Sequence, residues 1–420
     1  MVPEPSRLEL YLSGQLTEAM LDSSGSFTMA RERAVEKLAA FQLPRPATWI
    51  LKLIQGLVAG GTDSIRISLR ARETELRFQL AQPWSLEAVE DAFWDPEITD
   101  CVALDHLKRG LWNVAIKQQC PFQLNLAGWE QALIWTGQEL RRLKIAAESH
   151  STLTLSCQQS LQGARNSPQT NADLLREIQH YAFVCSVPLS VDGRRVDALQ
   201  AGPHHGYGPT TVPFFLATAS AFLEKLSVPL GTWEGYSPEV VAEGQPERLG
   251  RRKVGGRGPV SVAGVVALHR ERDNDGDWQA RSARSHMYWV KDGVVVHQEE
   301  LDLEADVSIS CGVFASAQGM ATDLTGFSFM DGAEVAERRR KACASIKPIW
   351  SCTEWSLDYL NMKGAKQAAF VRFGKNLLRW LVLRLPSLWQ TQSGPEQLYD
   401  VHKCDLATLR KNWRQLCQRR

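Results

Sequence analysis

The stretch that decides the fold is residues 49–69, WILKLIQGLVAGGTDSIRISL. Ahead of its double glycine, the apolar side chains recur at spacings of one, three and four, which places them on one face of a helix. Gly60 and Gly61 then end the helical pattern, as glycines commonly do. Residues 65–69 alternate apolar and polar side chains, the pattern of a half-buried strand. We therefore expect a helix over 49–58 followed by a strand.

The same alternation of helix and strand patterns continues to about residue 200. A charged turn joins the first strand to a second one at Leu76 and Phe78, which predicts a hairpin. Ser85 stands where an N-cap belongs, ahead of a short helix with glutamates in its first turns. Another helix is expected from Asp105, and further strands are expected over 129–137, 151–159 and 183–199, the last with a turn at Asp192-Gly193. Helices and strands mixed in this way predict an α/β sandwich built on a mixed sheet.

The second half of the chain divides into three parts. Residues 231–259 are crowded with Gly, Pro and charge, which predicts an exposed loop or linker. Three strand-like runs follow at 260–268, 285–301 and 307–315, the second with a turn signal at Asp292-Gly293, and then a helical run. From Glu334 onward 17 Lys/Arg face 7 Asp/Glu, so a total charge of +1 leaves −9 for the preceding residues. We expect domains over 1–200 and 259–345, a glycine-rich loop and linker region over 201–258, and a basic, Trp-rich helical region over 346–420.

Residues 51–78, LKLIQGLVAGGTDSIRISLRARETELRF, resemble the signature helix and following strands of the GHKL ATPases, and in particular of the ninety-kilodalton heat-shock chaperones. In that family, a helix of pattern E-L-I-x-N-A-x-D-A is followed by a glycine, here Gly61, and by strands. The resemblance implies an α+β Bergerat sandwich with a mixed sheet, a second α/β middle domain and a helical C-terminal extension.

The residues that carry the family's chemistry are replaced. The family's acidic residue falls on Lys52, its magnesium-binding Asn on Gly56 and its helix Asp on Ala59. The family's adenine-binding D-x-G-x-G segment would start near Leu80. The residues here, LAQPWS at 80–85, contain neither an Asp nor a Gly. Of the glycine-rich lid only Gly110, near Asn113, has a counterpart.

These replacements bear directly on nucleotide binding and turnover. A lysine has the wrong proton affinity to activate water at pH 7. Losing a hydrogen bond to a charged group costs about 1.5–3 kcal/mol, or roughly ten- to a hundredfold in affinity. We therefore expect no catalytic residue, no metal site and weak or absent binding of ATP and magnesium. Lys52 is expected on the solvated surface, with a phosphate contact as the alternative.

The resemblance extends to a middle-domain loop in which Asp323, Leu324 and Thr325 take matching places. The family's phosphate-sensing Arg belongs where this chain has Gly326-Phe327. The expected function is therefore that of a chaperone-like pseudo-ATPase, a scaffold that binds another protein through its Trp- and Arg-rich C-terminal region.

Two other functions stay open. One is a working ATPase with a pocket rebuilt from residues such as Asp91, Asp95, Asp105 and Asn113. The other is a protein that binds nucleic acid through its basic tail, 346–420, or through the run ERRRKA at 337–342.

Three remaining features concern metals, membranes and the redox environment. His204 and His205 lie between glycines, which predicts a surface loop rather than a metal site. No run of the chain is apolar and long enough to predict a membrane span. Nine scattered cysteines without a CxxC pair favour a reduced, cytoplasmic setting.

Overall fold

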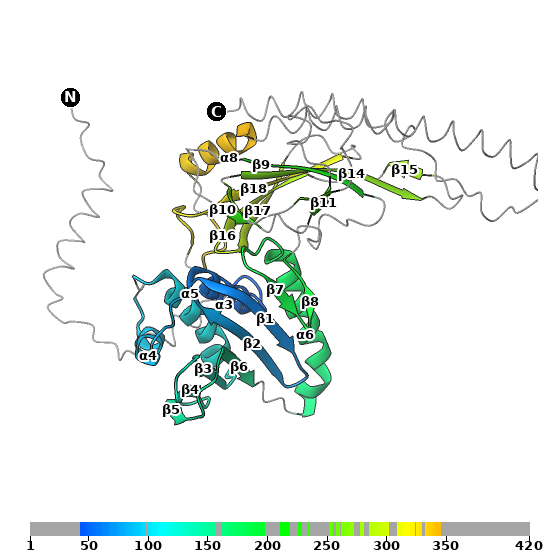
Figure 1. Cartoon of the computed structure of the whole chain (residues 1–420). Helices are drawn as coiled ribbons and strands as arrows, with labels where there is room; N and C mark the ends of the chain where they lie inside the picture. The colour runs from blue at the N-terminus through cyan, green and yellow to red at the C-terminus, as the bar shows by residue number, and fades with distance from the viewer. Residues whose placement is uncertain are drawn as a thin grey trace, which may run out of the picture.

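The structure is a computed structural model that describes most of residues 43–345. The described ranges are 43–97, 100–156, 161–197, 211–218, 226–228, 233–235, 252–254, 258–260, 262–272, 278–280, 285–301, 309–323, 325–329 and 332–345. They form two units, each built on its own sheet, which we call the first unit (residues 43–197) and the second unit (residues 211–345). Figure 1 shows the first unit in the lower part of the picture and the second unit above it.

The first unit is built on an eight-stranded mixed sheet of order β5-β4-β3-β6-β2-β1-β7-β8. Its strands are β1 (Thr62–Leu69), β2 (Glu73–Leu80), β3 (Phe122–Asn125), β4 (Gln131–Trp135), β5 (Leu140–Lys144), β6 (Ser151–Ser156), β7 (Leu189–Val191) and β8 (Arg194–Arg195). All neighbours pair antiparallel except β1 and β7, which are parallel. The expected mixed sheet and the β1–β2 hairpin are therefore confirmed.

Helices accompany this sheet on one side. They are α3 (Trp49–Ala59), α4 (Leu86–Trp94), α5 (Val102–Leu111), the π-helical turn η1 (Trp112–Lys117) and α6 (Leu161–Tyr181). As expected from the sequence, Ser85 caps α4, its hydroxyl accepting the Ala88 N–H at 3.1 Å. Gly60 ends α3, and Gly61 takes a left-handed φ of +74° that side chains other than glycine rarely adopt.

The core of the first unit lies between the helices and one face of the sheet. Alternate residues of β1 and β2 point into it, and Ile65, Ile67, Leu76 and Phe78 are all buried. The intervening residues face the other side, which stays polar. This one-sided burial explains why strict alternation in the sequence located both strands.

The second unit is built on a six-stranded sheet of order β15-β14-β18-β16-β17, with β9 also paired to β14. Its strands are β9 (Thr211–Thr218), β14 (Val262–Arg272), β15 (Trp278–Ala280), β16 (Ser285–Lys291), β17 (Val294–Leu301) and β18 (Ile309–Ser316). Two small pairs join β10 (Leu226–Val228) to β13 (Gly258–Val260) and β11 (Trp233–Gly235) to β12 (Arg252–Val254). The helix α8 (Ala333–Ser345) follows.

Some elements differ from the sequence expectation. The range 201–258, expected as a loop and linker, contains β9, β10, β11 and β12, and β9 pairs along its whole length with β14. The sequence pattern also missed β3 and β5, both of five residues or fewer. The His204-His205 loop and the C-terminal region 346–420 lie outside the described residues. Within the described ranges, no helix has the length and apolar character that crossing a membrane requires.

Candidate functional site

The candidate site lies where α3 and α5 of the first unit meet the second unit, and its centre is α3. Thr48 precedes this helix, and nine consecutive residues from Trp49 to Leu57 are buried. The buried set includes two polar side chains, Lys52 and Gln55. A buried amide needs hydrogen-bond partners, and a buried lysine needs such partners or must lose its proton. An amphipathic helix against one sheet would leave such residues in solvent. Full burial follows because α3 is covered by α5 on one side and by the second unit on another.

Glycines allow α3 and α5 to pack with their backbones in contact. A Cβ built on Gly56 would lie 2.9 Å from the carbonyl oxygen of Ala103 and 3.0 Å from the Leu107 nitrogen. A Cβ on Gly110 would meet the Leu53 side chain at 2.6 Å. Real Cβ atoms do not come so close, so both positions need glycine. Where the GHKL pattern has an asparagine side chain, this fold therefore has the backbone of α5.

Lys52 is buried against the second unit, with 1% of its surface exposed. Its ammonium lies 4.4 Å from the centre of the Phe327 ring, and a Cβ built on Gly326 would come within 2.7 Å of Nζ. Burial is the largest cause that lowers the pKa of Lys52 from 10.5 to about 7. The other charges that act on it are two cations and two carboxylates, Arg109, Lys291, Asp105 and Asp292.

The expectation that Lys52 is a solvated surface residue is thus wrong. It faces a loop of the second unit whose contact with α3 the local sequence does not encode. The physical reason is that Lys52 packs against Phe327, which lies more than two hundred residues later in the chain.

A loop of the second unit presents Gly326 and Phe327 to Lys52. One carboxylate oxygen of Asp323 accepts the N–H groups of Gly326, Phe327 and Ser328, at 2.9, 3.2 and 3.3 Å. The Thr325 hydroxyl also donates to Asp323, at 2.7 Å. Gly326 has a φ of +71°, which suits glycine. Asp323 and Thr325, expected as middle-domain loop residues, therefore hold the loop's shape. Among the described residues, neither forms a hydrogen bond or an ion pair with the first unit.

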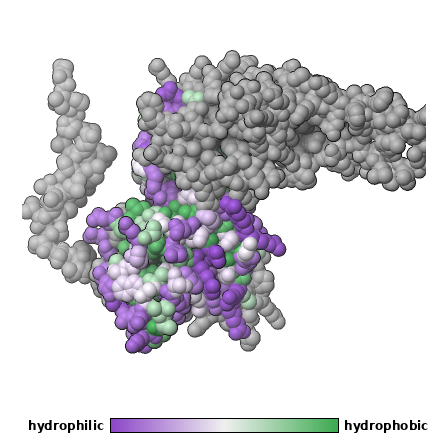
Figure 2. All heavy atoms as spheres, in the orientation of Figure 1, coloured by the Kyte–Doolittle hydropathy of each residue, from purple (hydrophilic) through white to green (hydrophobic). Residues whose placement is uncertain are grey.

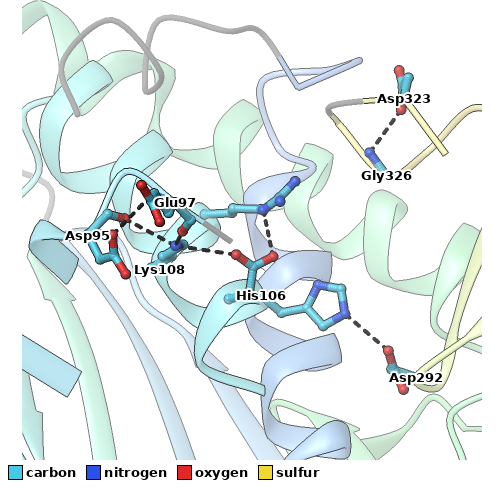
Figure 3. Close-up of polar contacts among 9 residues, drawn as sticks. Asp95, Glu97, His106, Lys108, Asp292, Asp323 and Gly326 are labelled. Atoms are coloured by element: carbon cyan, nitrogen blue, oxygen red, sulfur yellow. Dashed lines mark hydrogen bonds and ion pairs between the residues drawn. The ribbon is translucent and has the colours of Figure 1, made fainter. Parts of the chain in front are cut away.

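A second contact is made by the two-residue turn that joins β16 to β17. Asp292 and Gly293 have φ values of +50° and +76°, the conformation of a type I′ hairpin turn. Asp292 accepts hydrogen bonds from Nε2 of His106 and from the Gln318 side chain, both at 3.0 Å. Figure 3 shows His106 pointing from α5 directly at Asp292. Beside it, the Gln55 side chain donates to the Lys291 carbonyl at 3.1 Å.

The polar groups of this contact are incompletely satisfied. His106 is buried, and burial lowers its pKa while the hydrogen bond to Asp292 acts in the opposite direction. Its Nδ1 atom and the Oε1 atom of Gln55 have no hydrogen-bond partner among the described residues. Buried atoms of this kind cost free energy. We call the set Lys52, Gln55, His106, Lys291, Asp292, Gly326 and Phe327 the inter-unit contact.

Sequence reasoning missed three members of this set as site residues: Gln55, His106 and Lys291. The available signal was a polar side chain at helical spacing on an otherwise apolar face, which marks a buried polar partner. Asp292 was recognised as a turn residue but not as the acceptor that joins the two units. Its contact partner lies 186 residues away in the chain.

The other expected pocket residues do not gather around Lys52. Ala59 is exposed at the end of α3, and Leu80 is buried at the end of β2 opposite Thr62. Gly61 forms the left-handed turn after α3. Asn113 lies in η1, where its side-chain oxygen accepts from the Gln118 amide at 3.0 Å. Only Lys52, Gly56 and Gly110 share the α3–α5 layer.

Of the acidic residues considered for a rebuilt pocket, Asp95 and Asp105 both lie beside the Lys108 ammonium. Asp91 is exposed on α4, and Asp105 forms an ion pair with Arg109 at 2.8 Å. Figure 3 shows Asp95 and Glu97 beside Lys108, whose ammonium bonds their backbone carbonyls. Across the described part of the chain, no three His, Cys, Asp or Glu side chains come together as potential metal ligands.

The basic run of α8 is paired with acids. Arg338 bonds Glu334, Arg339 bonds Glu299, and both Arg340 and Lys341 bond Glu337. These four cations share three carboxylates, so each has an acidic partner within the fold.

Comparison with known proteins gives structural matches alone. No family model matches the chain, and no curated protein sequence matches it. Among solved structures, the ATPase domain of the mismatch repair endonuclease MutL from Aquifex aeolicus is matched at 9% identity with a TM-score of 0.34, covering 72% of this chain and 99% of that domain. A single-substitution variant of the same domain is matched at 9% identity with a TM-score of 0.36, covering 71% and 100%.

Proposed function

We propose that this chain is a degenerate GHKL-type protein, a pseudo-ATPase that serves as a scaffold for another protein and binds ATP weakly or not at all. The observation that carries the proposal is the packing of Gly56 on the backbone of α5. A magnesium-binding side chain has no room there, because even a Cβ would be 2.9 Å from the Ala103 oxygen. The position from which the resembling family holds metal and phosphate is filled by protein.

The cover over Lys52 supports the same function. A phosphate group near this lysine would have to displace Phe327 and the Gly326 backbone, which the Asp323 carboxylate fixes through three N–H bonds. A hydrogen bond to a charged group contributes about 1.5–3 kcal/mol, so breaking this loop offsets much of what one phosphate contact would gain. The inter-unit contact thus favours two units held together without nucleotide.

The proposed partner is another protein, bound in part through the Trp- and Arg-rich range 346–420. This assignment stands on composition, because Trp and Arg are enriched at interface hot spots. A chaperone-like role follows from the resemblance of residues 51–78 and belongs to the same proposal.

Calorimetry tests the proposal on the full-length protein. We expect no heat of binding when ATP with magnesium is titrated to about 1 mM, which corresponds to a binding free energy weaker than about 4 kcal/mol. The same titration on Phe327→Ala, which uncovers Lys52, should also show none. Micromolar affinity with magnesium-dependent phosphate release by the wild type would overturn the proposal. Micromolar binding by Phe327→Ala alone would do so as well, since it would reveal a working pocket under a lid.

A further inference from the structure

A row of arginines crosses the outer face of the eight-stranded sheet, the face opposite the helices. Arg77 of β2 lies directly opposite Arg66 of β1, Arg66 pairs with Ser190 of β7, and Ser190 pairs with Arg195 of β8. Arg66 is exposed, and the side chains of Arg77 and Arg195 are 50% and 53% exposed. We call Arg77, Arg66 and Arg195 the arginine row. Figure 2 shows hydrophilic residues gathered over the side of the first unit where β1, β7, β8 and α6 lie.

The arginine row is unfavourable for the isolated fold. Like charges directly opposite each other destabilise an antiparallel pair, and Arg66 and Arg77 are such a pair. Arg77 is paired with Glu75, and Arg195 with the buried carboxylate of Asp197 at 2.9 Å. Within the described residues, Arg66 has no ion pair of its own. A threonine or serine, as on the neighbouring strands β6 and β7, would suit the position better.

We propose that the arginine row is a docking surface for an acidic segment of a partner protein. The row spans three strand spacings of about 4.8 Å, or roughly 14 Å in all. About four extended residues cover that length, so a short cluster of Glu or Asp can reach all three guanidinium groups. Arg66 offers a planar fork of N–H donors that fits a carboxylate, and Arg77 and Arg195 have further N–H donors besides those bonded to Glu75 and Asp197. This inference rests on the proposed scaffold function and names the chemistry of its partner.

Charge decides between this occupant and two others. A second copy of the chain would set arginine against arginine. A nucleic acid would bring a continuous polyanion against Glu75, which lies on the same face, and against a body that carries −9 before residue 334. A short acidic peptide avoids the first repulsion and limits the second, because its charge is confined to the row, where three guanidinium groups outnumber the carboxylates of Glu75 and Asp197.

The test measures fluorescence anisotropy on the full-length protein with a fluorescein-labelled tetraglutamate peptide flanked by glycines. We expect the wild type to bind it and to ignore the matching tetraglutamine peptide. Arg66→Glu should weaken binding by about tenfold, because it removes one attraction and adds one repulsion. Arg176→Glu, the same charge change on exposed α6, is the matched control and should leave affinity within about twofold.

A stability measurement separates recognition from folding. Arg66→Thr removes the like-charge pair, so its midpoint of urea unfolding should equal or exceed that of the wild type while peptide binding weakens. Equal binding of both peptides, equal affinity of wild type and Arg66→Glu, or tighter binding of a single-stranded DNA of equal charge would overturn the proposal. The arginine row lies on the sheet face opposite α3, which carries Lys52 and Gly56, so these outcomes are read independently of the nucleotide titration.

Discussion

Replacing Lys52 by methionine measures directly what the buried ammonium costs the fold. Methionine has a similar length and no charge, so the packing against Phe327 is largely kept. A pKa lowered from 10.5 to about 7 corresponds to about 5 kcal/mol at 1.36 kcal/mol per pKa unit. The variant also loses the contact between ammonium and ring, worth about 0.5–2 kcal/mol. Desolvation is the larger effect, and we expect Lys52→Met to be more stable than the wild type at neutral and acid pH.

The pH dependence identifies the cause. The unfolded chain keeps the Lys52 proton up to about pH 10.5, whereas the folded protein releases it near pH 7. Between these values the folded state binds fewer protons, so the stability of the wild type rises with pH. Below pH 7 the full cost remains. The stabilisation by Lys52→Met should therefore be greatest below pH 7 and shrink steadily as the pH rises toward 10.5.

Urea unfolding followed by tryptophan fluorescence, from about pH 6 to about pH 10, measures the difference in unfolding free energy. The control is Lys117→Met in η1, an exposed lysine whose replacement should change stability little at any pH. A difference between Lys52→Met and wild type that stays constant across this range would refute the reasoning. So would a variant less stable than wild type below pH 7.

Two segments of the second unit contact the first unit: the turn at Asp292-Gly293 and the loop held by Asp323. Each gives a further prediction. Asp292→Ala removes the acceptor of His106 and should cost about 1–3 kcal/mol in urea unfolding, because it leaves a buried donor unpaired. In the same variant, the pKa of His106 measured by NMR should fall further, since the hydrogen bond that raises it is lost; an unchanged value would contradict the contact. Asp323→Ala should speed hydrogen exchange at Phe327 and its neighbours, because three N–H groups lose their shared acceptor. Unchanged exchange there would mean that the loop is held by other contacts.

Local features of the fold could be predicted from the sequence because their causes are local. The helix of residues 49–58, the β1–β2 hairpin and the Ser85 cap each follow from spacing or from one side chain. The turns at Asp192-Gly193 and Asp292-Gly293 follow from dipeptides that favour positive φ. The strand β5 escaped detection because, at the edge of the sheet, four of its five residues are exposed and no alternation arises.

The candidate site could be predicted only in part, because its causes are long-range. Lys52 and Gly326-Phe327 each depart from the pattern of the resembling GHKL family. Nothing local indicates that they touch, since they lie more than two hundred and seventy residues apart. Gly56 stands where the resembling pattern has an asparagine, whereas its packing role becomes visible only when α5 is placed beside it. The sequence identifies the positions that differ from the resembling pattern, and the fold brings Lys52 and Phe327 into contact.

The replacements at Gly56 and Lys52 act together, and this gives a last prediction. Without a side chain at 56, the backbone of α5 can approach α3 and fill the space in front of this position, where the resembling GHKL pattern has an asparagine. At position 52, a lysine accepts the Phe327 ring as a cover, which a carboxylate would not. Under the proposed function, introducing the residues of the resembling GHKL pattern in Lys52→Glu/Gly56→Asn should therefore not confer ATP binding. The asparagine would overpack against Ala103 and destabilise the protein by about 1–3 kcal/mol. Calorimetry and urea unfolding of this double variant, with exposed Ala59→Asn as the control, check both statements. Micromolar ATP affinity at undiminished stability would mean that the α3–α5 packing adapts easily and does not by itself prevent nucleotide binding.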